Sequence, residues 1–371
     1  MRAQVSEVRR VPDKEILPRL RLLERNFMEK VKAWFLLCRP WSLTATAVPF
    51  MVFVFWKIGM AFGERRGETL FDFGWDRLGL AFVAAAALQL ACNLLNTWGD
   101  NRSGVDNVPD AYVTTPQIQQ GYVTPRQVFL LALGFLAVTV SIGACLSFKI
   151  ENGGLLVNWS LLAVGAVGVL GASNYATLLK FKYHGLGTPF VFFLMGPVFY
   201  MGIMASCLGF EFQNEPLSVH LATAMSVFFV SLPVASLVAV ILFGNDMRDR
   251  LTDAAAGIKT AATVLGPRKT LLLFWVLHLF PYVHCIAATA LLFAVLPADA
   301  IGWRFVLASL VPFAVLPLSL KTVRSATADY RKNPENPYWF GYERASGKVH
   351  FLFGFLYSFA VVLALSGCPC R

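Results

Sequence analysis

Six of the 22 acidic residues in this chain gather in two short segments, and the sequence around both is apolar. The first acidic segment, residues 93–110, contains Asn93, Asn96, Thr97, Asp100, Asp106 and Asp110; the second, residues 245–260, contains Asn245, Asp246, Arg248, Asp249, Asp253 and Lys259. Side chains three, four or seven residues apart share a helix face, so each segment presents a polar stripe if it is helical. Paired carboxylates on one face repel each other unless a cation lies between them. Such oxygen ligands suit Mg²⁺, which is usually held by one or two carboxylates plus substrate phosphate.

Basic residues near the acidic segments indicate what else could bind there. Arg248 and Lys259 belong to the second segment, and Lys180 and Lys182 lie in a separate polar loop. Carboxylates that hold Mg²⁺, with Arg and Lys beside them, form a clamp suited to a diphosphate. Because the flanking sequence is apolar, the pattern favours a prenyl diphosphate, with its charged head on the clamp and its tail among helices.

The same residues also have purely structural interpretations. An Asp in a loop after a membrane span is usually a solvated cap. Intramembrane amides such as Gln89 and Asn93 often hydrogen-bond one helix to another. Two separate stripes with similar spacing are less ordinary, so the spacing favours a functional site.

The composition of the chain predicts the elements that position these residues. Apolar residues make up 57% of the 371 residues and charged residues 15%, with a mean hydropathy of +0.59. These values exclude a soluble multidomain enzyme and a disordered chain. Nine segments are apolar enough to cross a membrane, at about 41–62, 78–97, 127–148, 155–175, 187–208, 219–243, 270–296, 301–320 and 350–367. We therefore expect an all-α integral membrane protein with a basic segment over 1–40 and a nine-helix domain over 41–371.

The distribution of basic residues predicts the orientation in the membrane. With a cytoplasmic N-terminus, the cytoplasmic side carries 25 Lys and Arg residues and the opposite side six. Positive charge collects on the cytoplasmic side, where anionic lipids also lie. Both acidic segments are then cytoplasmic. The net charge of +10 is explained by this distribution and does not require a nucleic-acid partner. Membrane lipids are expected partners, and no obligate protein partner is expected.

The residues around both acidic segments resemble the UbiA superfamily of intramembrane prenyltransferases, and most closely its 1,4-dihydroxy-2-naphthoate polyprenyltransferases of menaquinone synthesis. The matching stretches are Arg39-Pro40, Asn96 to Asp106, Gln120 to Thr124, Tyr183 to Gly187, Gly196-Pro197, and Asn245 to Asp253 with Gly257, Lys259, Thr260, Leu265 and Gly266. Thr97 departs from the family pattern, which usually has an aspartate there. Residues 114–117 also lack the basic residue that the family carries before its Gln-x-Gly segment.

The resemblance implies a fold, a reaction and roles for particular residues. The fold is nine helices around a central cavity, and the reaction is Mg²⁺-dependent ionisation of a prenyl diphosphate followed by capture of the prenyl group by an aromatic quinone precursor. Carried over by position, Mg²⁺ or its waters would be held by Asn96, Asp100, Asp106, Asp249 and Asp253. The diphosphate would be bound by Asn93, Lys182, Arg248 and Lys259. The residues expected to carry catalysis are Asp100, Asp249, Asp253 and Lys259. The resemblance also leads us to expect a bacterial inner membrane.

Three other functions fit the same residues. The acceptor could be another aromatic compound or a lipid alcohol, as the change at Thr97 suggests. A transporter would use intramembrane polar groups, although transporters usually place charged groups near the bilayer midplane. A related protein could also bind a prenyl diphosphate without transferring it. The sequence does not predict the length of the prenyl chain.

Overall fold

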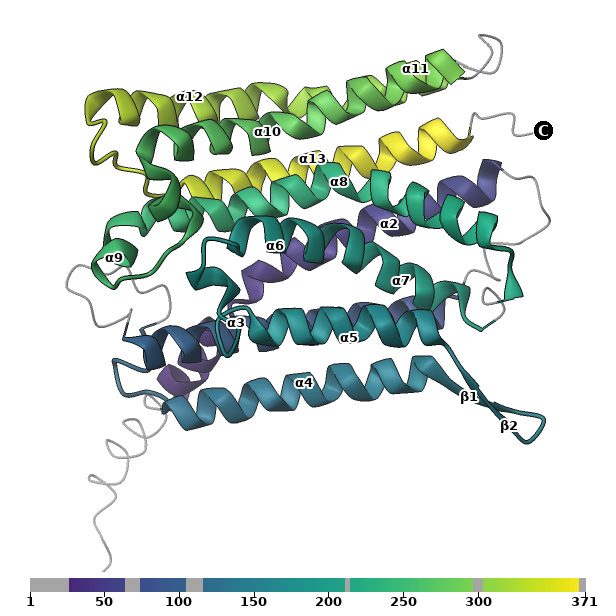
Figure 1. Cartoon of the computed structure of the whole chain (residues 1–371), viewed down its shortest axis with the longest axis horizontal. Helices are drawn as coiled ribbons and strands as arrows, with labels where there is room; N and C mark the ends of the chain where they lie inside the picture. Colours follow the sequence, from purple (N-terminus) through teal and green to yellow (C-terminus); the bar gives the residue numbers. More distant parts are fainter. Residues whose placement is uncertain (1–26, 64–73, 105–115, 211–213, 296–302, 367–371) are drawn as a thin grey trace, which may run out of the picture.

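The computed structural model describes residues 27–63, 74–104, 116–210, 214–295 and 303–366, and its elements are labelled in Figure 1. A helix over residues 27–38 comes first. The other elements, in chain order, are η1 (Pro40–Leu43), α2 (Thr44–Gly63), α3 (Trp75–Ser103), α4 (Pro125–Ser147), β1 (Phe148–Glu151), β2 (Gly154–Val157), α5 (Trp159–Asn174), η4 (Phe181–Tyr183), α6 (Gly187–Phe193), η5 (Leu194–Val198), α7 (Phe199–Leu208), α8 (Leu217–Arg248), α9 (Arg250–Ala255), α10 (Ala261–Val295), α11 (Trp303–Leu310), η8 (Val311–Val315), α12 (Leu316–Lys332) and α13 (Tyr342–Ser366).

The predicted all-α membrane architecture is confirmed. Eight helical stretches of the described residues are long and apolar enough to cross a membrane, and each overlaps one predicted segment. They are Phe27–Ala61, Trp75–Ser103, Pro125–Ser147, Gly187–Leu208, Leu217–Arg248, Ala261–Leu291, Trp303–Lys332 and Tyr342–Leu365. The ninth predicted segment forms α5, which is apolar but has 16 residues. That is short of the roughly 20 residues needed to span a bilayer.

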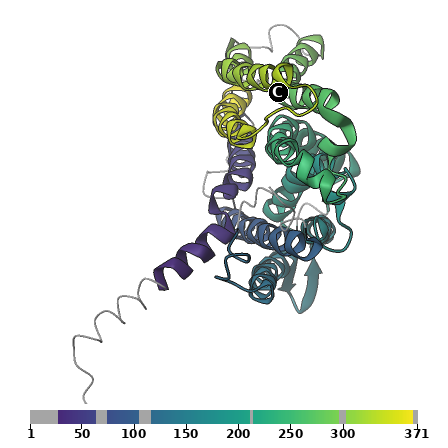
Figure 2. The ribbon, with the colours of Figure 1, turned by 90° about the vertical axis from the view of Figure 1, so that its left-hand side faces the viewer.

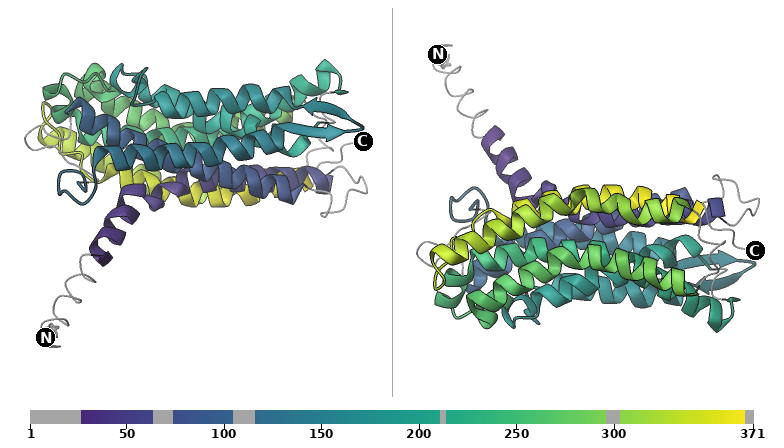
Figure 3. Two further views of the ribbon diagram at one scale, coloured as in Figure 1. Left: turned by 90° about the horizontal axis from the view of Figure 1, so that it is seen from below. Right: turned by 90° about the horizontal axis from the view of Figure 1, so that it is seen from above.

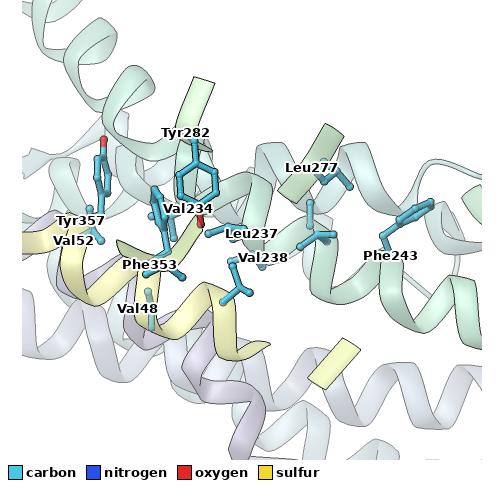
Figure 4. Packing of buried hydrophobic residues seen from close by; sticks show 14 of the residues in the cluster. Val48, Val52, Val234, Leu237, Val238, Phe243, Leu277, Tyr282, Phe353 and Tyr357 are labelled. Atoms are coloured by element: carbon cyan, nitrogen blue, oxygen red, sulfur yellow. The ribbon is translucent and has the colours of Figure 1, made fainter. Parts of the chain in front are cut away.

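The main core lies where α2, α8, α10 and α13 meet. Figure 4 shows Val48 of α2, Leu237 of α8 and Phe353 of α13 within this core. A Cβ atom at Gly354 would overlap the side chain of Val48, so the glycine allows α13 to approach α2 closely. The core is therefore built from helices that are far apart in the sequence.

A second group of helices is formed by α3, α4 and α5, and Figure 2 shows the bundle end-on. Leu94 of α3 packs against Val128 and Ala132 of α4. Helix α4 begins with a capping box, in which Thr124 and Gln127 satisfy each other's backbone N–H groups. These three helices form the side of the bundle that faces the main core.

The two ends of the bundle differ. One end carries the helix over residues 27–38, together with η4 and α9. The hairpin of β1 and β2 projects from the other end (Figures 1 and 3). The antiparallel hairpin was not predicted, and it occupies the short connection before α5. Because α3 and α8 both terminate at the α9 end, the two acidic segments come to the same face of the bundle, as the predicted order of spans requires.

Polar side chains bind the helix ends together near the hairpin. Arg77 donates to the carbonyl oxygens of Leu146 and Ser206, at 2.9 and 2.8 Å. Asn158 is 1% exposed; its Nδ2 donates to the carbonyl oxygens of Ala205 and Gly209, and its Oδ1 accepts from the backbone of Leu161. These bonds join the ends of α3, α4, α5 and α7.

Replacing Asn158 with alanine is expected to destabilise the protein by about 2 kcal/mol, because buried backbone groups of α5 and α7 lose their partners. Thermal unfolding of the purified protein in detergent would measure this as a fall in melting temperature. Asn336→Ala is the matched control, since Asn336 is exposed in a loop. An equal fall in both variants would show that the hydrogen bonds of Asn158 are not responsible.

Candidate active site

A cavity of about 1590 Å³ lies inside the bundle. Its lining comes mainly from α3, α4, α5, the α6–α7 stretch, α8 and α13, with smaller contributions from η1, the start of α2, η4 and α9. Charged and amide side chains line the end where α3 and α8 terminate, and mainly alanine, glycine, valine and leucine line the rest. Small-molecule pockets usually have volumes of about 300–1,000 Å³. This cavity is larger and has one polar end, so it suits a long amphipathic substrate.

The first acidic segment is helical over residues 93–103, where it forms the end of α3. Asn93, Asn96 and Asp100 lie on one face of the helix and line the cavity. The Oδ1 atom of Asn96 is buried and has no hydrogen-bond partner among the described residues. Asp106, the other expected metal ligand of this segment, lies outside the described residues.

Asp100 is bound by two side chains from η4. The Nζ atom of Lys182 lies 2.8 and 2.9 Å from its two carboxylate oxygens. The hydroxyl of Tyr183 donates to Oδ1 at 2.5 Å. Burial alone would lower the pKa of Lys182, but the negative charge of Asp100 more than offsets this and holds that pKa above its usual value. Lys182 is therefore a cation, and it neutralises a carboxylate at the polar end of the cavity.

The second acidic segment spans the joint between α8 and α9. Asp249 lies between the two helices and forms an ion pair with Arg248, whose Nε and Nη2 atoms each lie 2.6 Å from a carboxylate oxygen. The Nη1 atom of Arg248 also lies 3.1 Å from Oδ1 of Asn245 and 3.5 Å from Oε1 of Glu343. This network holds the Arg248 guanidinium at the cavity wall, where α8 meets α13.

Asp246 and Asp253 line the same end of the cavity, and each is only 4% exposed. Burial raises the pKa of Asp253 to about 7, while Lys182 opposes the rise and the Asp249 and Asp100 carboxylates add to it. Burial and the neighbouring carboxylates both disfavour the ionised form of Asp253, and a cation bound beside it would stabilise that form. The site therefore favours a bound cation.

The donor set fits Mg²⁺. Within the described ranges, no three His, Cys, Asp or Glu side chains lie close enough together to hold a metal by themselves. The unpaired Asn96 oxygen and the carboxylates of Asp100, Asp249 and Asp253 are hard ligands around one cavity end. Mg²⁺ keeps several waters and is often completed by substrate phosphate, so it does not need a closed protein cage.

Two expected diphosphate ligands lie differently from the others. Asn93 lines the cavity, but its Nδ2 donates to the carbonyl oxygen of Cys38 and to Ser42, so it joins α3 to the chain before α2. Lys259 is exposed and does not line the cavity. Its backbone pairs with His184, which connects the loop after α9 to the loop that carries Lys182.

Comparison with known proteins identifies the family of the chain. Residues 50–334 match the UbiA prenyltransferase family. The chain belongs to the UbiA prenyltransferase family. It is an integral membrane protein of that family, and the predicted superfamily is confirmed.

Relatives extend the similarity over almost the whole chain. UbiA prenyltransferase domain-containing protein 1 from Xenopus tropicalis is 27% identical over 355 residues, which cover 92% of this chain and 85% of the relative. A UbiA homologue from Aeropyrum pernix K1, solved in its apo form, covers 85% of this chain and 96% of its own with a TM-score of 0.56 and 17% identity. A UbiA homologue from Archaeoglobus fulgidus bound to DMAPP and Mg²⁺ covers 86% and 98%, with a TM-score of 0.49 and 15% identity. None of these names specifies dihydroxynaphthoate or a bacterial inner membrane.

The structure of this UbiA family member adds residues to which the sequence analysis gave no role. Tyr183 follows Lys182 and binds the same carboxylate. Glu343, which contacts Arg248, is one of three acids in segment 321–349, and no spacing in the sequence distinguished it from the other two. Tyr175 lines the cavity with a buried hydroxyl that has no hydrogen-bond partner among the described residues, and no spacing in the sequence marked it.

Proposed function

We propose that this protein transfers a prenyl group from a prenyl diphosphate to an aromatic acceptor at the polar end of the cavity. One observation carries the proposal: four aspartates, with Lys182 and Arg248 among them, line one end of a cavity whose other walls are mainly apolar. The C–O bond to the diphosphate breaks, and a C–C bond forms to the ring carbon of the acceptor. That carbon loses a proton, or carbon dioxide if it carries a carboxylate.

The roles that we propose for the site residues follow from their positions. Mg²⁺ or its waters would be held by Asn96, Asp100, Asp106, Asp249 and Asp253. Bound Mg²⁺ would neutralise the charge that builds on the diphosphate as it leaves. Lys182 and Arg248 would bind diphosphate oxygens directly, since both are charged and line the cavity. Lys259 and Asn93 would support that end, one from the neighbouring loop and one from within α3.

The apolar part of the cavity would protect the reaction. A prenyl cation is captured by water wherever water reaches it, and apolar walls exclude water from the reacting carbon. Phe190, Leu194 and Phe199 of the α6–α7 wall are among the apolar lining residues. The same walls would hold the prenyl tail, so one cavity would serve binding and protection.

The finer proposal is that the acceptor is 1,4-dihydroxy-2-naphthoate, which would place the protein in menaquinone synthesis. Arg39 lines the cavity near the acidic stripe of α3, and Arg344 and Lys348 line it from α13, so cations are present for an acceptor carboxylate. Thr97, where the sequence departs from the family pattern, motivates a second candidate, an acceptor without a carboxylate; its hydroxyl accepts a hydrogen bond from Arg39 at 3.2 Å. We further propose that this end of the bundle faces the cytoplasm, as the basic residues predict.

Prenyl transfer by the purified protein in detergent tests the proposal. The assay would supply Mg²⁺, geranylgeranyl diphosphate, and either dihydroxynaphthoate, its decarboxylated analogue or a lipid alcohol. A prenylated product from either aromatic compound supports the reaction, and the preferred compound identifies the acceptor. Diphosphate binding without any product would leave a binding protein, and substrate flux in proteoliposomes without turnover would indicate a transporter.

A further inference from the structure

A smaller groove lies between α10 and α12, separate from the large cavity. These two helices pack against each other at one edge of the bundle (Figures 1 and 2). The groove is lined by Trp275 of α10 and by Arg324, Thr327, Ala328 and Arg331 of α12. None of these five residues lines the cavity that contains the carboxylates. The α10–α12 groove is therefore a site of its own, and its chemistry can be considered apart from the reaction.

The side chains of α12 determine the shape of the groove. Arg324, Ala328 and Arg331 are three to seven residues apart, so they share one face of the helix, and all three are exposed. The seven residues between the two arginines correspond to about 10.5 Å along the helix. Ala328 is small, so space remains between the two long side chains. On the α10 side, Nε1 of Trp275 donates to the hydroxyl of Thr327 at 2.9 Å, which fixes the indole as one wall.

The positive charge of the groove is not balanced by the helices that form it. Helix α10 contains no acidic residue, and Asp329 is the single acid of α12. Asp329 is bonded to Lys332 and to the hydroxyl of Tyr342. Within the described part of the chain, the side chain of neither groove arginine has an ion pair or a hydrogen bond. Two guanidinium groups are thus open to an anion, and a guanidinium binds phosphate through parallel hydrogen bonds.

The place of the groove along the helices corresponds to the level of lipid headgroups. Residues 305–320 carry no charged side chain, and both arginines lie beyond this stretch, toward the end of the span at Lys332. Because α10 follows α9, this is the end of the bundle that carries α9. Tryptophan is enriched where headgroups meet hydrocarbon, and long arginine side chains reach from there to the headgroups. Val276 and Val283 are exposed and continue from Trp275 toward the opposite end, so lipid chains would find apolar surface there.

We propose that the α10–α12 groove binds the phosphate of an anionic phospholipid, from the leaflet at the α9 end of the bundle. The two guanidinium groups would converge on the phosphate over Ala328, and Trp275 would pack beside the upper part of the lipid chains. Basic pockets between membrane helices are typical sites for anionic headgroups. A zwitterionic lipid would bind less well, because its headgroup brings a positive charge next to two arginines. A bound lipid would also connect α10 to α12 and stabilise this edge of the bundle.

Lipid binding by the purified protein in a neutral detergent tests this inference. Dioleoyl phosphatidylglycerol is the test lipid, phosphatidylcholine with the same chains tests the need for an anionic headgroup, and inorganic phosphate tests the need for lipid chains. Native mass spectrometry measures the bound lipid, and the melting temperature reports stabilisation. Phosphatidylglycerol should be retained and should raise the melting temperature, whereas the other two should have little effect. Equal stabilisation by inorganic phosphate or by phosphatidylcholine would overturn the inference.

Substitutions within the groove locate the binding site. Arg324→Gln and Arg331→Gln should each weaken phosphatidylglycerol binding about fivefold, and together about 25-fold, because each arginine near an anionic lipid contributes separately. Ala328→Leu keeps both charges but fills the space between them, so it should weaken binding as well. All three positions are exposed, so these variants should fold like wild type. Unchanged binding in the double arginine variant would overturn the inference.

Arg126→Gln is the matched control. Arg126 is exposed in the first turn of α4, at the same end of the bundle, and does not line the groove. This variant should retain wild-type binding. An equal loss in Arg126→Gln and Arg324→Gln would overturn the inference and indicate a diffuse attraction between basic residues and anionic lipid. None of these measurements requires prenyl transfer, so the inference is tested independently of the proposed function.

Discussion

Asp249→Asn is expected to lower prenyl transfer at least about a thousandfold. The side chain keeps its shape, but it loses the charge that would attract Mg²⁺ and the ion pair that orients Arg248. Mg²⁺ and Arg248 would both stabilise the leaving diphosphate, so the substitution disturbs two groups at once. Removal of one preorganised charge-stabilising group typically costs about 10²–10³ in turnover. Release of diphosphate, measured with the purified variant and saturating donor, reports the loss directly. EDTA should bring the wild-type rate down to the same low level.

Controls separate this effect from misfolding. Asp76→Asn changes an exposed aspartate in the first turn of α3, at the far end of that helix, and should retain the wild-type rate. The melting temperature of Asp249→Asn should stay close to that of wild type, because Arg248 keeps its contacts with Asn245 and Glu343. Full activity of a folded Asp249→Asn protein is incompatible with a role for this carboxylate in the reaction.

The parts of the molecule that the sequence predicts best are those governed by local periodicity. All nine apolar segments form helices, and Asn93, Asn96 and Asp100 share a face of α3 because helical spacing alone requires it. The hairpin of β1 and β2 escaped prediction, since a ten-residue stretch next to an apolar span offers no clear alternation. The shortness of α5 likewise depends on where Asn158 caps the helix, which the apolar composition does not show.

The contacts that join the site come from packing and are less predictable. Lys182 meets Asp100 although 82 positions separate them, and only the arrangement of α3 against η4 brings them together. The sequence indicated that both belonged to one site, yet their pairing needed the fold. Lys259 shows the opposite case: its position beside the second acidic segment suggested a place in the clamp, but the turn after α9 leaves it exposed. Proximity in sequence to an acidic stripe does not fix the direction of a loop side chain.

Lys182→Gln is expected to lower the ratio kcat/KM for the prenyl diphosphate about a hundredfold, mainly through a higher KM for that substrate. In the structure Lys182 neutralises Asp100, and on substrate binding its ammonium group would be available to a diphosphate oxygen. The KM for the aromatic acceptor should change little. Lys180→Gln is the control, since Lys180 is exposed two residues away and should keep both constants. Equal losses in the two variants would point to a general effect of charge at the membrane surface.

A double variant distinguishes direct binding from mere neutralisation of Asp100. Lys182→Gln alone leaves the Asp100 carboxylate buried with only Tyr183 and no cation, so the melting temperature should fall. Adding Asp100→Asn removes that uncompensated charge and should restore much of the stability, because the two changes act on one contact. If Lys182 also binds diphosphate, the double variant stays inactive and its affinity for a non-hydrolysable prenyl diphosphate analogue stays low. Recovery of that affinity together with stability would mean that Lys182 serves only to keep Asp100 in place.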